Sequence, residues 1–224
     1  MYRAKKADEK EYGKLHKTVM DLSKEAGIPK PKVYIVPTAT PNAFATGRNP
    51  KNASVACTEG ILHLLNDEEL KGVLAHELGH VKNRDILVQT IAATIAAVIS
   101  YIAMIARWGA IFGSRDDNAG ELFAVLALSI LTPIIATILQ LAISRSREYM
   151  ADATGARLAG NPQALANALR KLEHENKRQP LKGGNVATSS MFIVNPFSAK
   201  GMMALLSTHP PMEKRIKRLE EMKI

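Results

Sequence analysis

Two long runs without charge constrain the fold of this chain more than any other feature. No Asp, Glu, Lys or Arg occurs in 86–106 or in 122–144. As helices rising 1.5 Å per residue, both would be roughly 30 Å long, which matches the hydrocarbon thickness of a bilayer. Buried helices of a large soluble core are the alternative, but uncharged runs above about 18 residues are rare in domains of this size. We therefore expect a transmembrane hairpin.

The charges around this hairpin predict its orientation. The connecting loop holds two basic and three acidic residues: Arg107, Arg115, Asp116, Asp117 and Glu121. The outer ends of the two runs are flanked by basic residues: Lys82, Arg84, Arg145 and Arg147. Because basic residues are retained on the cytoplasmic face of a membrane, we expect the loop to lie outside and the rest of the chain to lie in the cytosol.

A second feature, the run HELGH from His76 to His80, predicts a metal site. Asn66 and Glu69 form a predicted capping box, and apolar residues at helical spacing follow, so the run lies inside a helix. Residues four apart lie about 40° apart around a helix axis, so both imidazoles can bind one ion. Glu77 projects about 100° further round, where it can reach a water on the metal as a general base.

A catalytic zinc site needs a third protein ligand, and Glu148 is the candidate. It lies in the helical segment SRSREYMAD, in which Asp152 falls one turn later on the same face. A carboxylate at that position can accept the far N–H of a ligand histidine, here His76, which fixes the tautomer of the ring and raises its basicity.

The two segments together carry a family resemblance. HELGH followed by EYMAD is the HExxH plus ExxxD arrangement of the gluzincin metallopeptidases. The surrounding segments 41–47, 144–149 and 208–211 resemble those of HtpX-like membrane peptidases, relatives of the CAAX-processing protease Ste24. The likeness runs from about Lys14 to the C-terminus. It implies an α+β, mostly helical fold: a gluzincin-type zinc peptidase domain with a small β-sheet and an inserted transmembrane hairpin.

The resemblance also implies a function. It is that of a zinc endopeptidase with one Zn²⁺ per chain, multi-pass in the cell (inner) membrane of a bacterium or archaeon. Its expected substrates are damaged or misfolded membrane proteins, cut at the cytoplasmic face. A non-catalytic scaffold, an aminopeptidase and a prenyl-protein protease are the alternatives. The intact motif set argues against the first, the lack of an acidic exopeptidase motif against the second, and the two spans are too few to enclose the chamber that the third requires.

Further site residues follow from the resemblance alone. The strand with Asn42, Ala43 and Phe44 is expected to bind substrate in extended form, although Phe44 by itself fits a core position equally well. His209, in the run Thr208-His209-Pro210-Pro211, is expected to stabilise the oxyanion of the intermediate.

Other polar residues near the motifs have open interpretations. Tyr149 is a second candidate for the oxyanion donor, or it packs. Arg145 and Arg147 either steer a carbonyl, pair with Asp152 or serve as solvated basic anchors. Three further histidines are expected at the surface: His16, His63 and His174.

Charge and cysteine content exclude other classes. The net charge is +9, yet the basic residues are scattered and no nucleic-acid motif occurs, so an anionic membrane surface explains the excess better. The single cysteine, Cys57, excludes an internal disulfide, suits a reducing compartment and is expected to pack in a strand. No signal peptide is expected at the start. Relatives usually carry two earlier spans, so we expect either a trimmed sequence or a short variant. No feature indicates an oligomeric state.

The spacing of apolar residues, together with the Gly and Pro residues between segments, predicts the remaining elements. A first helix carries Leu15 to Ala26 and ends at Gly27, a helix covers about 161–177, and a last one has Met212, Ile216 and Leu219 inward. The expected strands are 33–36, 42–46 and 54–57, and the loop 179–190 is expected to lie over the cleft. These elements give a peptidase domain in two parts, 1–85 and 145–224, around a membrane insertion at 86–144.

Overall fold

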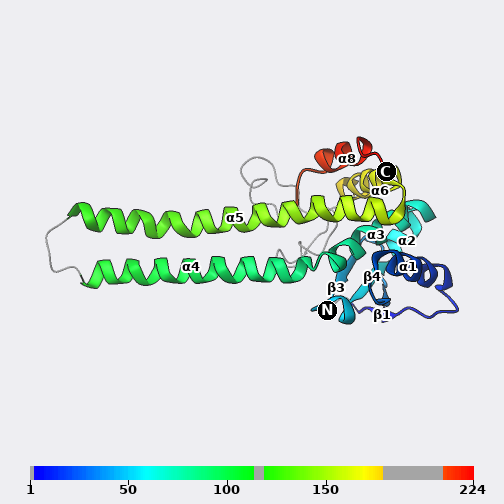
Figure 1. Cartoon of the computed structure of the whole chain (residues 1–224), viewed down its shortest axis with the longest axis horizontal. Helices are drawn as coiled ribbons and strands as arrows, with labels where there is room; N and C mark the ends of the chain where they lie inside the picture. The colour runs from blue at the N-terminus through cyan, green and yellow to red at the C-terminus, as the bar shows by residue number, and fades with distance from the viewer. Residues whose placement is uncertain (1–2, 114–118, 179–208) are drawn as a thin grey trace. The chain divides into compact units, whose positions relative to one another are not determined.

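The computed structural model describes residues 3–113, 119–178 and 209–224 (Figure 1). By its internal contacts the chain divides into two compact units. The first unit combines Met1–Leu87 with Arg145–Ile224, and the second is Val88–Ser144. The expected loop at 179–190 lies outside the described residues.

The first unit contains a small sheet and several helices. Its strands are β1 (Lys5–Lys6), β2 (Lys32–Val36), β3 (Ala43–Thr46) and β4 (Ser54–Thr58). A short 3-10 helix, η1, covers Pro50–Asn52. Its α-helices are α1 (Gly13–Ala26), α2 (Glu59–Leu64), α3 (Asp67–Lys82), α6 (Pro162–Arg178) and α8 (Met212–Glu220). Two long helices, α4 (Asp85–Gly113) and α5 (Ala119–Ala159), continue from this unit into the second.

The sheet has the strand order β1-β2-β4-β3. The strands β2 and β4 are parallel, with Val33 opposite Val55, whereas β1 and β3 pair antiparallel with their neighbours. The three strands expected from the sequence are present. The strand β1 was not expected, because its two exposed lysines give no apolar alternation. This order leaves β3 at one edge of the sheet.

The helix α3 lies at the centre of the first unit. It contacts α1, α6 and β3, and Val73, Leu74 and Leu78 are fully buried. Its start is the predicted capping box: Glu69 N–H donates to Asn66 Oδ1 over 2.9 Å, and Asn66 N–H donates to Glu69 Oε2 over 3.0 Å. Because α3 is covered on several sides, the HELGH run is held inside the core.

The second unit consists of two apolar helical segments, from α4 and α5. Asp85–Phe112 and Phe123–Ala159 are long and apolar enough to cross a membrane. Their large apolar side chains are mostly exposed, including Ile102 at 60% and Leu128 at 61%. A soluble core would bury such side chains, so these helices fit a lipid environment. The mostly helical α+β fold with a small sheet and an apolar hairpin is as the resemblance implied.

Two histidine expectations are confirmed and one is wrong. His63 and His174 are exposed. His16 is buried on the inner face of α1, and its Nε2 lies 3.1 Å from the carbonyl oxygen of Ala7. Position 16 lies next to the apolar stripe of Leu15, Val19 and Leu22, which carries it into the core, and the carbonyl of Ala7 contacts one of the two ring nitrogens.

Cys57 lies in β4 with no exposed surface, as expected. Burial, reinforced by the nearby charge of Glu77, raises the pKa of its thiol to about 12. We therefore expect iodoacetamide at pH 8 to label Cys57 only after denaturation, as measured by mass spectrometry. A His63→Cys variant supplies an exposed thiol on α2 as the control, which should react in the folded protein. Complete labelling of Cys57 in the folded wild type would contradict this prediction.

Candidate metal centre

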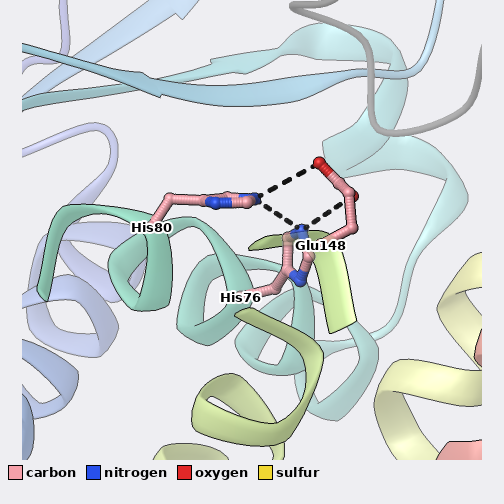
Figure 2. Close-up of side chains that lie close together, drawn as sticks. All are labelled: His76, His80 and Glu148. Carbon is pink, nitrogen blue, oxygen red and sulfur yellow. Dashed lines mark hydrogen bonds and ion pairs between the residues drawn. The ribbon is translucent and has the colours of Figure 1, made fainter. Parts of the chain in front are cut away.

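Two histidines from α3 and one glutamate from α5 converge in the first unit (Figure 2). His76 Nε2 lies 3.1 Å from His80 Nε2 and 3.9 Å from Glu148 Oε2, and His80 Nε2 lies 3.7 Å from Glu148 Oε1. Zinc bonds of about 2.0–2.2 Å in tetrahedral geometry separate ligand atoms by roughly 3.3–3.6 Å. The three observed separations lie around that value, so the group could hold one zinc ion.

The far nitrogen of each histidine faces a buried carboxylate. His76 Nδ1 lies 3.0 Å from Asp152 Oδ1, the contact expected from the sequence. His80 Nδ1 lies 2.7 Å from Asp85 Oδ2, a contact that was not expected. With both rings neutral and each Nδ1–H directed at its carboxylate, the two Nε2 atoms are left as the acceptors that a metal ion requires. This arrangement supports a metal site.

Small residues let α5 approach α3 closely enough to form the cluster. A Cβ on Gly155 would lie 2.6 Å from the backbone nitrogen of His76, and one on Gly79 would lie 3.1 Å from the carbonyl oxygen of Ala151. A side chain at position 155 would therefore push the two backbones apart. Because Glu148 lies two turns before Gly155 on α5, this close packing carries the carboxylate to the histidines.

Glu77 is buried on α3 and is held by the edge strand. The backbone N–H of Ala45 in β3 donates to Glu77 Oε2 over 2.8 Å. Burial raises the pKa of the Glu77 carboxyl above its ordinary value, and the charges of His76 and His80 and the Ala45 hydrogen bond oppose this only in part. A carboxylate of raised basicity is suited to accept a proton from water.

Arg215 on α8 is part of the centre and was not identified from the sequence. Its side chain is fully buried. The Nε and Nη2 groups donate to the two carboxylate oxygens of Asp152 over 2.8 and 2.7 Å, and Nη1 lies 3.0 Å from Glu148 Oε2. Burial opposes ionisation, but the guanidinium lowers the pKa of Asp152 to about 2 and holds that of Glu148 well below its usual range.

A feature of the sequence could have revealed Arg215. The inward residues of α8 recur at helical spacing as Met212, Ile216 and Leu219, and position 215 falls on the same stripe. An arginine on an apolar stripe needs a buried partner. Arg215 was not identified because α8 is rich in lysine and arginine, which are usually exposed to solvent.

The other expected site residues take different places. His209 Nδ1 lies 3.4 Å from Glu148 Oε1, so His209 belongs to the cluster. The guanidinium of Arg218 lies over the ring of Tyr149, with its Cζ atom 4.3 Å from the ring centroid. Of the alternatives left open for Arg147, pairing with Asp152 is not observed: Arg147 contacts Asp85, and Arg215 contacts Asp152.

Three residues were expected to bind substrate, and they lie at the start of β3. Asn42 is buried: its N–H donates to Thr58 Oγ1 over 2.8 Å, and its carbonyl accepts the N–H of Thr58 over 2.9 Å. Ala43 is buried and Phe44 is half-buried. The structure thus gives Asn42 a role in joining β3 to β4.

A HExxH helix whose histidines meet a glutamate of a later helix, in a chain with two membrane-length apolar helices, defines a membrane metallopeptidase. Residues 9–223 match the model of Peptidase family M48. The chain belongs to this family.

Proteins from several organisms are similar in sequence to this chain over nearly its whole length. It is 55% identical over 222 residues to "Protease HtpX homolog" of Pyrococcus abyssi, covering 98% of this chain and 77% of that protein. It is 56% identical over 227 residues to the protein of the same name from Syntrophotalea carbinolica, covering 100% and 80%. The crystal structure of S. mikatae Ste24p is similar in fold, with a TM-score of 0.64 at 20% identity, over 97% of this chain and 52% of that one.

Proposed function

We propose that this metallopeptidase is a zinc-dependent endopeptidase in which His76, His80 and Glu148 bind one Zn²⁺. The convergence of their three ligand atoms, at separations of 3.1–3.9 Å, is the observation that supports it. Nitrogen and carboxylate ligands suit zinc, and three protein ligands leave a fourth position for water.

Peptide hydrolysis follows from the groups around this cluster. Bound zinc would lower the pKa of a water toward about 7 and polarise the scissile carbonyl. Glu77, fixed by the Ala45 N–H, takes the proton of the attacking water and returns it to the leaving amine. His209 is the proposed donor to the developing oxyanion, and its contact with Glu148 supports this role. Asp152 orients His76 and is itself held by Arg215.

The edge of the sheet is the proposed substrate site. The carbonyl of Asn42 accepts a hydrogen bond from β4, and backbone groups alternate along a strand, so those of Ala43 and Ala45 point away from β4. The Ala45 N–H donates to Glu77, which agrees with this register. An extended peptide that pairs with this edge is recognised through its backbone, with Phe44 and Asn42 shaping the strand, and needs little particular sequence.

Backbone recognition favours unfolded segments as substrates. We propose that the protein cuts damaged or misfolded membrane proteins, and that its peptidase part, 1–85 and 145–224, faces the cytoplasm. The apolar hairpin at 86–144 would anchor it as a multi-pass protein in the cell (inner) membrane. The basic residues flanking this hairpin support the orientation.

Zinc content and cleavage products test this proposal together. We expect about one zinc per chain by elemental analysis of the detergent-purified protein, and internal fragments of casein that a chelator abolishes. Cleavage that persists without metal would contradict the zinc mechanism. Stepwise trimming from one end would indicate an aminopeptidase, and metal without cleavage would indicate a scaffold.

A further inference from the structure

We propose that Asp85 and Arg147 form a positioning pair that orients His80 toward the metal; the inference rests on the proposed zinc site. Asp85 is 2% exposed, and its Oδ2 lies 2.7 Å from His80 Nδ1. Its other oxygen, Oδ1, accepts a hydrogen bond from Nε of Arg147 and forms an ion pair with Nη2 of the same guanidinium. Each carboxylate oxygen therefore has its own partner, and Asp85 is fixed between the ligand and the guanidinium.

This contact decides which nitrogen of His80 faces the metal. Donation of the Nδ1–H to Asp85 leaves the lone pair on Nε2, the atom that lies 3.1 Å from His76 Nε2 and 3.7 Å from Glu148 Oε1. A carboxylate behind a ligand imidazole also raises its basicity. Without Asp85 the ring could rotate or take the other tautomer, and the second ligand would lose its direction.

The turn between α3 and α4 brings Asp85 to this position. Arg84 has a φ of 53°, a left-handed conformation that is uncommon for a residue with a Cβ. The turn is tied to α5 at two further points. Arg147 Nη2 donates to the carbonyl oxygen of Asn83 over 3.2 Å, and Asn83 Nδ2 donates to Thr154 Oγ1 over 3.3 Å. Arg147 thus fixes both the carboxylate and the turn that carries it.

The two histidines are supported in parallel ways. His76 is backed by Asp152 and Arg215, and His80 is backed by Asp85 and Arg147. Arg147 directly precedes Glu148, so two adjacent residues of α5 supply one ligand and the arginine that supports another. The position of α5 would thereby determine both the location of Glu148 and the orientation of His80.

Metal affinity and geometry test the pair. In Arg147→Met and Asp85→Asn we expect the zinc dissociation constant, measured by competition with a chelator dye, to rise roughly 10- to 100-fold. The visible spectrum of the cobalt-substituted protein should change in both variants, because the geometry at His80 changes. The double variant should be no weaker in zinc binding than the worse single one, since both substitutions act through one contact.

Arg170→Met is the matched control, because it also removes an arginine–carboxylate pair, the exposed one with Glu220. It should leave zinc affinity and the cobalt spectrum unchanged. A variant at Asp85 or Arg147 that lowers only the melting temperature of the metal-free protein, with wild-type affinity and spectrum, would overturn the inference. Asp85→Asn keeps the side-chain volume and serves if Arg147→Met does not fold. Failure of the wild type itself to bind zinc would refute the proposed function instead.

Discussion

Glu77→Gln is expected to keep its zinc and to lose about 10²- to 10⁴-fold in the rate of peptide hydrolysis. Glutamine has nearly the volume of glutamate, and its amide oxygen can still accept the Ala45 N–H that now lies 2.8 Å from Glu77 Oε2. It cannot take a proton from water. The fold and the ligands should therefore survive while the proton transfer is lost. Casein cleavage and elemental analysis on one preparation measure both quantities.

His80→Ala separates the loss of the base from the loss of the metal. Removing His80 leaves two of the three clustered donors, so this variant should lose zinc as well as activity. A Glu77→Gln protein that cleaves casein at the wild-type rate would show that Glu77 is not the base. Zinc loss in Glu77→Gln equal to that in His80→Ala would instead make Glu77 part of the metal-binding structure.

Local sequence patterns were sufficient to predict the central helix and the hairpin. The capping box of Asn66 and Glu69 and the four-residue spacing of His76 and His80 depend only on residues within a turn of one another. The apolar hairpin is equally local, because it depends on an uninterrupted run without charge. Such features do not require knowledge of which segments meet in the folded chain.

The groups that support the ligands could not be predicted in the same way. Asp85 lies five residues after His80, but it reaches that ring only because Arg84 turns the chain in a left-handed conformation. Arg147 and Arg215 come from α5 and α8, and their partners are decided by packing across the unit. A basic residue in a charged segment has many possible partners, and only the tertiary contacts select one.

The balance of buried charge also supports a cation in the centre. Glu148 and Asp152 are buried side by side with Arg215, so one negative charge of the three groups is left uncompensated. A carboxylate in a low-dielectric site needs a paired charge or a metal. Glu77, also buried, adds to this need. Zinc at the three clustered donors would supply the missing positive charge.

Arg215→Met is expected to destabilise the metal-free protein by about 3–5 kcal/mol, the usual effect of breaking a buried ion pair. Methionine fills a similar volume, but the substitution removes the guanidinium that contacts Asp152 through two nitrogens and Glu148 through the third. Both carboxylates would then be buried with less compensation. For a chain of this size the melting temperature should fall by roughly 6–20 °C, measured by circular dichroism in detergent after chelation.

Zinc should reduce this difference, because the metal would give Glu148 a new positive partner while Asp152 keeps His76. The melting temperatures of wild type and Arg215→Met should therefore lie closer together with zinc than without it. Lys217→Met on the same helix is the control: its side chain is exposed, and its change should stay within about 0.5 kcal/mol. Equal melting temperatures for metal-free wild type and Arg215→Met would show that Arg215 does not balance the two carboxylates.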